Sequence, residues 1–334
     1  MSTGTGQRAK VIAFGSAFPA QVLSNADLAA LVDTSDAWIR ERTGIHARRQ
    51  LAEGENNSDI GTAAALDCLA KAGVGPRDVD LIIACSNTPD RWLPSLGSAI
   101  AAKLGTRPGV PAYDVVTACA GWLAGLQSAD ALVRSGHYAR VLVVGSEALT
   151  RYVDWTDRNT CILFGDGAGA ALVGPAALGD RGLILDVRLH TEGRFGDIMS
   201  LPAGGTCLPQ SQAVLDQRLQ YIHMDGLEVF AHAVRDMAEV SLEVLAANGF
   251  SAADVAWFVP HQANLRIMHN TAKRLGIALD KVAVNIHKYG NTSTATIPTC
   301  FDEYAADGRI RPGDLVLMTA FGGGLTWGAG LIRW

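Results

Sequence analysis

The chain contains one sequence pattern twice, so its fold has to consist of two similar halves. Residues 68–86 (CLAKAGVGPRDVDLIIACS) match residues 244–262 (VLAANGFSAADVAWFVPHQ) at an offset of 176 residues. Each segment has the pattern of a helix end, a glycine stop, a short loop with Asp-Val and a buried strand. We therefore predict two pseudo-symmetric halves, at residues 1–175 and 176–334.

Further pairs of segments match in the same order, which argues against a chance match. They are AAKLG (101–105) with AKRLG (272–276), PAYDVV (111–116) with VAVNIH (282–287), and RVLVVGSEA (140–148) with DLVLMTAFGGG (314–324). The first pair ends two helices, and the other pairs have the pattern of strands. Continuous apolar strands that alternate with helices are typical of sheets covered by helices on both faces. The pattern predicts a duplicated, layered α/β fold.

Composition and charge narrow the class of protein. With 334 residues, 49% of them hydrophobic, the chain is long enough for two buried cores. A net charge of −5 gives no indication of nucleic-acid binding. The sequence has no apolar run of the ~18 residues that a membrane span needs, and its start (MSTGTGQRAK) lacks the apolar core of a signal peptide. We expect a cytoplasmic enzyme that binds neither nucleic acid nor membrane.

The cysteines indicate free thiols in place of disulfides or a metal site. No Cys-x-x-Cys pair and no metal-ligand spacing occurs among Cys68, Cys85, Cys119, Cys161, Cys207 and Cys300. Free thiols in a reducing cytosol are the simplest account of this scatter. We expect no bound metal.

Cys119 has the sequence position of a candidate nucleophile. Residues 112–116 have the pattern of a buried strand, and apolar residues recur at helical spacing from Trp122 to Val133. Cys119 is thus expected at or just before the first helical turn, where unpaired N–H groups and the helix dipole favour a thiolate. Most unpaired cysteines simply pack in a core, so the position alone leaves both interpretations open.

The repeat brings two further polar residues toward Cys119. Aligning PAYDVVTACAG with VAVNIHKYGNTS places Asn291 next to Cys119. His261 ends the strand that matches LIIACS (81–86), and functional groups of α/β sheets gather at the carboxyl ends of strands. Taken singly, His261 could cap a strand, Asn291 could be a turn residue, and His287 could replace His261. Together, Cys119, His261 and Asn291 predict one shared pocket.

Two other patterns point to different functions. GDGAGA (165–170), followed by Asp186, imitates a dinucleotide-binding fingerprint, but Gly174 and Pro175 interrupt the helix that this motif needs. We predict a tight turn between adjacent strands there, and no NAD site. The chain order Cys, His, Asn also occurs in papain-like proteases, which carry the cysteine near the N-terminus with disulfides around it. A non-catalytic subunit of the same fold would lack the cysteine.

Seven ordered segments resemble the β-ketoacyl-acyl-carrier-protein (ACP) synthase III family of the thiolase superfamily. They are VDTSDAWIRERTGI (32–45), TACAG (117–121), TDRNTCILFGDGAGAAL (156–172), YIHMDGLEVF (221–230), VPHQANLRI (259–267), KYGNTSTATIP (288–298) and AFGGGLTWGAGLIRW (320–334). The similarity covers roughly residues 10–334. It implies a thiolase-like duplicated α/β/α/β/α layered fold with two pseudo-symmetric halves.

The resemblance implies an acyltransferase that condenses an acyl-CoA primer with malonyl-ACP. Cys119 would accept the acyl group, with the backbone N–H groups of Cys119 and Gly323 as the oxyanion hole. His261 and Asn291 would donate hydrogen bonds to the enolate that forms when the malonyl thioester loses CO2. The product would be a 3-oxoacyl-ACP at the start of fatty acid synthesis, formed without a cofactor.

The resemblance also implies where CoA binds. Trp38 and Arg158 would sandwich the adenine, with Arg42 near the 3′-phosphate or the base, since Trp and Arg planes stack well on nucleobases. Asn264 would bond the pantetheine arm. Trp38 could instead be a core residue on an amphipathic helix.

An acidic carrier protein requires a basic docking surface. Arg266 and Lys273 are candidates because they lie seven residues apart, on one face of an expected helix. Where the family usually has a lysine this chain has Ala231, and Arg235 one turn on could substitute. An ordinary charged surface is the alternative interpretation.

For the acyl chain, the resemblance implies a tunnel that includes Leu93 and Met224. Leu93 stands where some relatives carry a phenylalanine that reaches the tunnel across a dimer interface, so a longer or differently shaped primer than acetyl is expected. The expected partners are acyl-CoA, malonyl-ACP and a second copy of the chain, with malonyl-CoA left open as acceptor. The alternative is a specialised condensing enzyme or acyltransferase of secondary metabolism that uses another primer or acceptor.

Overall fold

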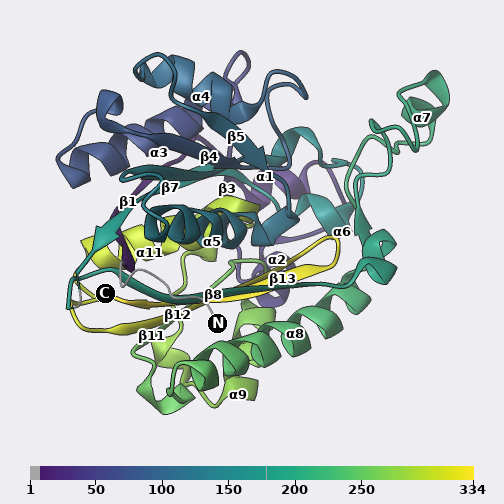
Figure 1. The fold of residues 1–334 in the computed structure, drawn as a ribbon. Coiled ribbons are helices and arrows are strands. Elements are labelled where there is room, and N and C mark those ends of the chain that lie inside the picture. The colour runs from purple at the N-terminus through teal and green to yellow at the C-terminus, as the bar shows by residue number, and fades with distance from the viewer. Residues whose placement is uncertain (1–7, 178) are drawn as a thin grey trace.

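The computed structural model describes residues 8–177 and 179–334, which form one large sheet system and the helices around it (Figure 1). Its strand order is β11-β12-β13-β8-β1-β7-β6-β4-β5. The bounds are β1 Arg8–Ala17, β4 Leu81–Cys85, β5 Ala112–Val115, β6 Val141–Ala148, β7 Asp166–Ala176, β8 Leu183–Thr191, β11 Trp257–Pro260, β12 Leu315–Gly322 and β13 Thr326–Arg333. Strands β1 and β8 meet only at the pair Lys10 and Leu183, so the system is in effect two sheets.

The two sheets have the same topology, as the sequence repeat predicts. In the first half β4 and β6 are parallel, and β7 and β1 follow antiparallel. In the second half β11 and β12 are parallel, and β13 and β8 follow antiparallel. Among the described residues of the second half, no full strand corresponds to β5, and only Val282 bridges to Phe258 of β11 there.

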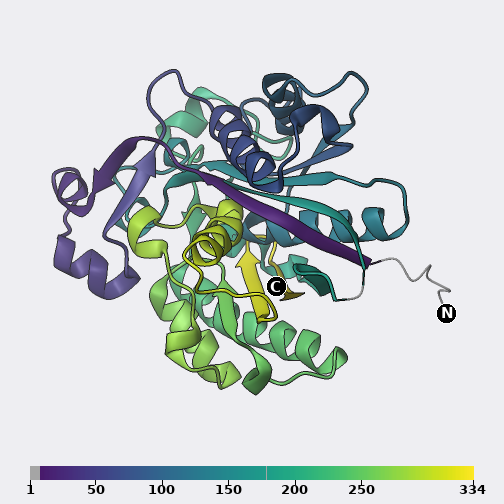
Figure 2. The same ribbon diagram turned by 90° about the vertical axis from the view of Figure 1, so that its left-hand side faces the viewer.

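Helices and sheets stack in five layers, which Figure 1 shows from top to bottom. The outer layer on the first sheet contains α3 (Asn57–Ala72) and α4 (Leu96–Leu104), and the outer layer on the second contains α8 (Gly226–Ala247) and α9 (Leu265–Leu275). The central layer contains α5 (Gly121–Arg134) and α11 (Thr296–Ala306), which pack together with strands of both sheets in one core cluster. The view in Figure 2, turned by 90°, keeps α11 between the two sheets.

Smaller elements border this body and carry several of the predicted site residues. They are β2 Gln21–Ser24, α1 Asn25–Ala29, α2 Asp36–Thr43, β3 Ala47–Gln50, α6 Arg158–Cys161, β9 Met199–Ser200, α7 Gln212–Asp216, β10 His223–Met224 and α10 Ile286–Tyr289, together with short 3-10 turns. The loop with α7 projects from the body at the upper right of Figure 1.

The helix ends that the sequence repeat predicts have the same conformation in both halves, which confirms this prediction. Gly73 ends α3, Gly105 ends α4 and Gly276 ends α9, each in the left-handed region with φ near 70°. Only glycine adopts this conformation without a steric cost, which explains why the sequence places it there. Residues Ser251 and Asp254 form a capping turn before β11 that matches the one before β4.

Two predicted elements were wrong in detail. Residues 112–115 do form a strand, but β5 is the edge of the first sheet and only partly buried, and Val116, directly after it, is 64% exposed. Residues 282–287 do not form the matching strand, because α10 begins at Ile286. Apolar runs of this length do not distinguish a buried strand from an edge strand.

The predicted turn at residues 165–170 was also wrong, although no dinucleotide-binding helix follows. Residues 166–176 form the long strand β7, between β6 and β1. Glycines in and directly before this strand permit close packing: a Cβ on Gly165 would lie 2.5 Å from Tyr289 O, and one on Gly169 would lie 2.7 Å from Pro298. The glycine spacing therefore reflects contact with the 289–298 segment instead of a phosphate site.

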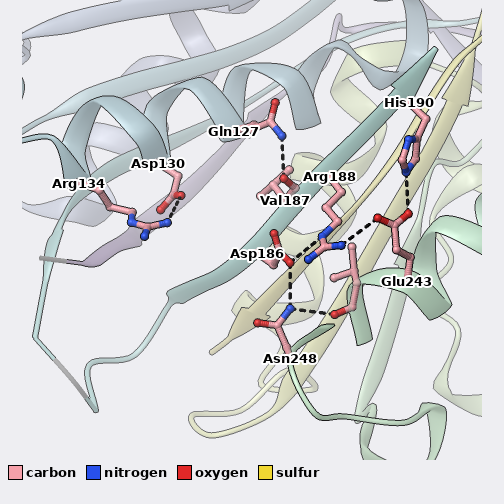
Figure 3. Close-up of polar contacts among 10 residues, drawn as sticks. Gln127, Asp130, Arg134, Asp186, Val187, Arg188, His190, Glu243 and Asn248 are labelled. Atoms are coloured by element: carbon pink, nitrogen blue, oxygen red, sulfur yellow. Dashed lines mark hydrogen bonds and ion pairs between the residues drawn. The ribbon is translucent and has the colours of Figure 1, made fainter. Parts of the chain in front are cut away.

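Polar contacts fix β8 to helices of both predicted halves (Figure 3). The side chain of Gln127, in α5, donates to Val187 O at 2.7 Å. Arg188 lies 2.9 Å from Asp186 and 2.9 Å from Glu243 of α8. The predicted boundary between residues 175 and 176 falls at the end of β7, and the division into two units stays a prediction.

Candidate active site

Cys119 lies where the sequence predicts it, directly ahead of a helix in the central layer. A 3-10 turn spans Ala118–Ala120, and α5 begins at Gly121. Ala118 has a positive φ of 46°, an uncommon conformation for a residue with a Cβ, and it aims the next residue away from the strand path. The Cys119 side chain is 5% exposed and lies at the wall of a cavity.

The expected preference of Cys119 for the thiolate was wrong. Burial raises the pKa of the thiol to about 12, and the Glu147 carboxylate nearby adds to this increase. A hydrogen bond with the Ser293 side chain acts in the opposite direction but is outweighed. The protein thus holds Cys119 as a thiol at neutral pH, and a proton has to leave when the sulfur is acylated.

His261 follows the end of β11 and is buried at 1% exposure. Burial lowers the pKa of His261 to about 3, so its ring is neutral at physiological pH. The ring nitrogen Nδ1 lies 2.6 Å from the Thr296 hydroxyl, at the start of α11. Nε2 has no partner among the described residues, and His261 lines the same cavity as Cys119.

Asn291 is held so that its amide N–H2 group faces the cavity. Its Oδ1 accepts a hydrogen bond from Ser293 N at 2.8 Å, and its backbone pairs with Leu163 and Gly165. The side chain is 5% exposed, and Nδ2 has no partner within the described part of the chain. Neutral His261 and Asn291 therefore both present groups that can bind a substrate oxygen.

The cavity that joins these residues has a volume of about 880 Å³. Its inner wall is largely apolar, and its outer wall carries the arginines predicted for CoA. The lining comprises Trp38, Arg42, Thr43, Cys119, Arg158, Asn159, Ile162, Leu163, Phe164, Met199, Met224, Asp225, Gly226, Leu227, Val229, Phe230, Ala233, Met237, His261, Ala263, Asn264, Arg266, Ile267, Asn291 and Phe321. A volume of this size accommodates a ligand with a long flexible arm.

The glycine-rich end of β12 packs against the Cys119 turn. A Cβ on Gly322 would lie 2.5 Å from Cys119 N, so only glycine permits this approach. The N–H of Gly323, the next residue, donates to no protein acceptor within residues 8–177 and 179–334. The oxyanion hole of Cys119 and Gly323 stays a prediction, since the residue whose Cβ would meet the Cys119 backbone is Gly322.

The predicted adenine residues gather at the mouth of the cavity. The guanidinium carbon of Arg42 lies 5.0 Å from the centre of the Trp38 ring, and that of Arg158 lies 5.1 Å from it. A base between two stacked planes needs two contacts of roughly 3.5 Å each. The separation of 5.1 Å between Trp38 and Arg158 is less than the sum of two such contacts. Arg158 therefore has to move aside for a base to enter.

A buried arginine, Arg48, connects helix α2, which carries Trp38 and Arg42, with the region of α6, which carries Arg158. Arg48 of β3 donates to Asn25 Oδ1 of α1 at 2.9 Å and to Ile162 O after α6 at 2.8 Å. Asn25 in turn donates to Asp36 of α2 at 2.9 Å. Arg48 therefore ties together α1, α2 and α6, which no sequence pattern indicated.

The other predicted contacts have mixed outcomes. Asn264 lines the cavity but is the N-cap of α9, accepting from Arg266 N and donating to Arg42 O at 3.1 Å. Arg266 and Lys273 are both exposed on α9. Arg235 is ion-paired with Asp236 at 2.7 Å, which reduces its availability to a partner.

The two predicted tunnel residues lie in different environments. Met224 of β10 is half-buried and lines the cavity beside Met199 of β9. Leu93 is 87% exposed and lines none of the cavity around Cys119. The histidine competitor His287 lies in α10, outside the cavity, with its ring 5.8 Å from that of His46.

One buried acid that acts electrostatically on Cys119, Glu147, was not predicted from the sequence. Glu147 of β6 is 0% exposed, and burial raises its pKa. Asn87 donates to it through Nδ2 at 2.7 Å, Thr88 through its hydroxyl at 2.6 Å, and Thr294 at 3.2 Å. The sequence signal for this site was the glutamate in the mostly apolar strand VLVVGSEA. A carboxyl group buried in such a strand needs dedicated hydrogen-bond partners.

Comparison with known proteins establishes the family. Residues 113–193 match the description "3-Oxoacyl-[acyl-carrier-protein (ACP)] synthase III", and residues 245–334 match its C-terminal part. The β-ketoacyl-ACP synthase III of Roseiflexus castenholzii is 46% identical over 98% of each chain. This chain belongs to the β-ketoacyl-ACP synthase III family. The predicted resemblance and the predicted acyltransferase class are confirmed.

Further synthase III proteins cover the whole length. That of Paramagnetospirillum magneticum is 46% identical over 98% of this chain and 99% of its own. The crystal structure of the Aquifex aeolicus enzyme superposes with a TM-score of 0.89 and 43% identity, over 98% of this chain and all of that one. The priming β-ketosynthase of the R1128 polyketide pathway has the same TM-score at 33% identity, over 99% and 98%. The predicted duplicated five-layer fold is confirmed.

Within residues 8–177 and 179–334, no helix is both long and apolar enough to cross a membrane. The same part of the chain holds no group of three or more His, Cys, Asp and Glu side chains that could bind a metal ion.

Proposed function

We propose that this synthase III family member condenses an acyl-CoA primer with malonyl-ACP to give a 3-oxoacyl-ACP, the first condensation of fatty acid synthesis. The observation that carries the proposal is that a buried thiol, Cys119, shares one cavity with two neutral donors, His261 and Asn291. A thiol there can hold an acyl group, and the donors can stabilise an enolate.

In the first step the Cys119 sulfur attacks the thioester carbonyl of acyl-CoA. The new S–C bond forms, the bond to the CoA sulfur breaks, and the thiol proton leaves with CoA as its own thiol. The oxyanion of the tetrahedral intermediate lies near the backbone N–H groups of Cys119 and Gly323. Aligned donors of this kind contribute about 10²–10³ in rate each.

In the second step a malonyl thioester occupies the same cavity and loses CO2. The electron pair of the broken C–C bond forms an enolate, whose oxygen accepts hydrogen bonds from His261 Nε2–H and Asn291 Nδ2–H. The enolate carbon attacks the acyl group, the S–C bond to Cys119 breaks, and the sulfur takes a proton from solvent. Because the departing carboxylate supplies the electrons, this chemistry needs no resident cofactor.

We assign the outer cavity to CoA and the adjacent surface to the carrier protein. Trp38 with Arg42 and Arg158 would hold the adenine and phosphates after Arg158 swings away, and Asn264 would bond the pantetheine arm with its remaining N–H. Arg266 at the cavity mouth and Lys273 on the same exposed helix would attract an acidic ACP.

We also propose a homodimer, in which Leu93 of each chain reaches the acyl site of its partner. Support comes from the edge strand β5 and the apolar side chains exposed around it: Trp92 at 70%, Leu93 at 87% and Val116 at 64%. Such a patch on one edge marks an interface. If Leu93 limits the acyl tunnel, the Leu93→Phe variant should prefer shorter acyl-CoA than the natural chain does.

The decisive experiment follows both steps separately. The protein is incubated with acyl-CoA of different chain lengths, intact mass identifies the acyl group on Cys119, and malonyl-ACP is then added. We expect acylation that Cys119→Ala abolishes, followed by release of a 3-oxoacyl-ACP. Acylation that persists in Cys119→Ala would refute the proposal.

The same experiment separates the alternative functions. Acylation without condensation would indicate a transferase, and a strict preference for an unusual primer would indicate a secondary pathway. The similarity to the R1128 priming ketosynthase is lower, at 33%, than the 46% to synthase III enzymes, so we favour the fatty acid reaction. The cytoplasmic location stays a prediction, in keeping with six free cysteines.

A further inference from the structure

Gln262, the residue directly after His261, is fully buried, and its side chain bonds to backbone groups. His261 itself lines the cavity, and its backbone N–H donates to Thr319 O of β12 at 2.7 Å. The Gln262 side chain instead reaches the segment 283–286, on the opposite edge of β11 from β12. The two neighbours therefore connect to different parts of the fold.

The Gln262 carboxamide is paired at all four of its hydrogen-bonding positions. Its Nε2 donates to Pro260 O at 2.7 Å and to Ala283 O at 3.2 Å. Its Oε1 accepts from Asn285 N at 3.0 Å and from Ile286 N at 3.3 Å. With two carbonyls at one end and two N–H groups at the other, only this orientation of the amide satisfies every partner.

The first half of the molecule has a strand ladder at the place where the second half uses Gln262. There β4 and β5 pair in parallel, and Ser86 N then donates to Val115 O at 3.3 Å. Ser86 matches Gln262 at the offset of 176 residues. Among the described residues of the second half, the corresponding segment makes one bridge to β11, between Val282 and Phe258. The Gln262 amide, which has the groups of a peptide bond, continues this pairing beyond the bridge.

The segment that Gln262 holds leads directly to Asn291. Helix α10 begins at Ile286, whose backbone N–H is one of the groups bound by Gln262. The helix is one turn long, and Gly290 N donates to Ile286 O at 2.8 Å where it ends. Asn291 is the next residue. Gln262 thus connects the chain at His261 to the helix that precedes Asn291.

We propose that Gln262 is a positioning residue that fixes the distance between His261 and Asn291. One planar amide joins the chain next to His261 to the start of the helix before Asn291. Because Gln262 is 0% exposed, water does not compete for its four partners.

The inference rests on the proposed condensation and predicts a split between its two steps. Acylation uses the Cys119 sulfur and the backbone N–H groups beside it, whereas decarboxylation needs His261 and Asn291 at the correct separation. Misplacement by about 1 Å can cost 10²-fold in rate. The Gln262→Met variant, which keeps a similar side-chain size and removes all four bonds, should lose decarboxylation of malonyl-ACP by roughly 10–100-fold and retain acylation within about threefold.

The Gln262→Glu variant gives a pH-dependent readout that a loss of packing does not produce. One carboxyl oxygen can still accept from Asn285 N and Ile286 N. The other oxygen then faces Pro260 O and Ala283 O, and it bonds to them only while it carries a hydrogen. Burial raises the pKa of a carboxyl group, so this hydrogen is present at pH 6 and lost toward pH 9. Relative to the natural protein at the same pH, decarboxylation should be lower by at most about threefold at pH 6 and by at least about 10-fold at pH 9.

The same substitution at another glutamine is the matched control. Gln127 of α5 also donates to a backbone carbonyl, Val187 O, but lies outside the cavity (Figure 3). Gln127→Glu should leave the ratio of the two steps unchanged at either pH. Equal loss of both steps in Gln262→Met, or a Gln262→Glu profile parallel to that of the natural protein, would overturn the proposal. If Gln262→Met does not fold, the profile of Gln262→Glu decides.

Hydrogen exchange at single amides tests the contact without substrate. The amides of Asn285 and Ile286 should exchange at least about 10-fold faster in Gln262→Met than in the natural protein. The Ala283 amide, which donates to Phe258 O at 2.8 Å, is the internal control and should keep its protection. Unchanged exchange at Asn285 and Ile286 would refute the inference. Failure of the condensation itself would appear separately, as absent acylation or absent product in the natural protein.

Discussion

At the scale of single residues, burial keeps both titratable groups of the site neutral. It raises the pKa of the Cys119 thiol to about 12 and lowers the pKa of the His261 ring to about 3. Both shifts have the same cause, since a low-dielectric surrounding disfavours whichever form is charged. The proposed reaction benefits, because a neutral imidazole can donate a hydrogen bond without giving up its proton to the enolate.

The high pKa of Cys119 predicts an unusual pH profile for its alkylation. In a Cys207→Ser background, which removes the exposed thiol, the rate of reaction with iodoacetamide should keep rising up to at least pH 10. A small free thiol with a pKa near 8.5 levels off above about pH 9. Mass spectrometry of the Cys119 peptide measures the rate, and a plateau below about pH 10, such as an ordinary thiol shows, would contradict the prediction.

The low pKa of His261 predicts how stability depends on pH. Between its ordinary pKa of 6.5 and about 3, the unfolded chain binds a proton at this position that the folded chain does not. The natural protein should therefore lose free energy of unfolding, relative to His261→Gln, as the pH falls below 6.5. Urea unfolding of both proteins from pH 8 to pH 5 checks this, and a constant difference would show that His261 titrates normally.

At the scale of elements, the site depends on close approaches between segments distant in sequence. The end of β12 touches the Cys119 turn, and the 289–298 segment lies against the glycines of β7. Glycine at these points allows backbone to pack on backbone, which no longer side chain permits. Arg48 performs a related task for the elements that carry the residues proposed to bind CoA, because it donates to the Asn25 side chain in α1 and to the Ile162 carbonyl after α6.

The Gly322→Ala variant tests the contact between β12 and Cys119, the proposed nucleophile. The added Cβ would lie 2.5 Å from Cys119 N, so the turn that carries the sulfur has to shift. Because misplacement by about 1 Å can cost 10²-fold in rate, we expect a loss of that order in acylation. Gly193→Ala is the matched control, since nothing lies within 4 Å of its Cβ, and it should change the rate by less than about twofold. Equal effects would exclude a special role for the contact.

At the scale of the whole molecule, duplication creates one site from two halves. The Cys119 turn precedes the central helix of the first half, and Asn291 precedes the corresponding helix of the second, α11. Since α5 and α11 lie together between the sheets, their leading turns face one cavity. The first sheet ends in the exposed edge strand β5, whereas the second has only the Val282 bridge in the corresponding place.

The exposed edge predicts the oligomeric state. We expect a dimer of two 35.2 kDa chains, and expect Val116→Asp to dissociate it because a charge next to β5 opposes burial there. Val22→Asp alters another exposed valine, on β2, and should leave the dimer intact. Light scattering after size-exclusion chromatography gives the masses. A monomeric natural protein would contradict the predicted dimer.

Local patterns in the sequence were sufficient for the repeat, the order of elements and the three residues that line the cavity. Helix ends at Gly73 and Gly276 depend on φ preferences, and these are properties of the residue itself. Tertiary packing alone decided that β5 is an edge, that residues 165–170 lie within a strand, and that Cys119 is a thiol. Exposure and pKa depend on neighbours from distant parts of the chain, which local periodicity does not specify.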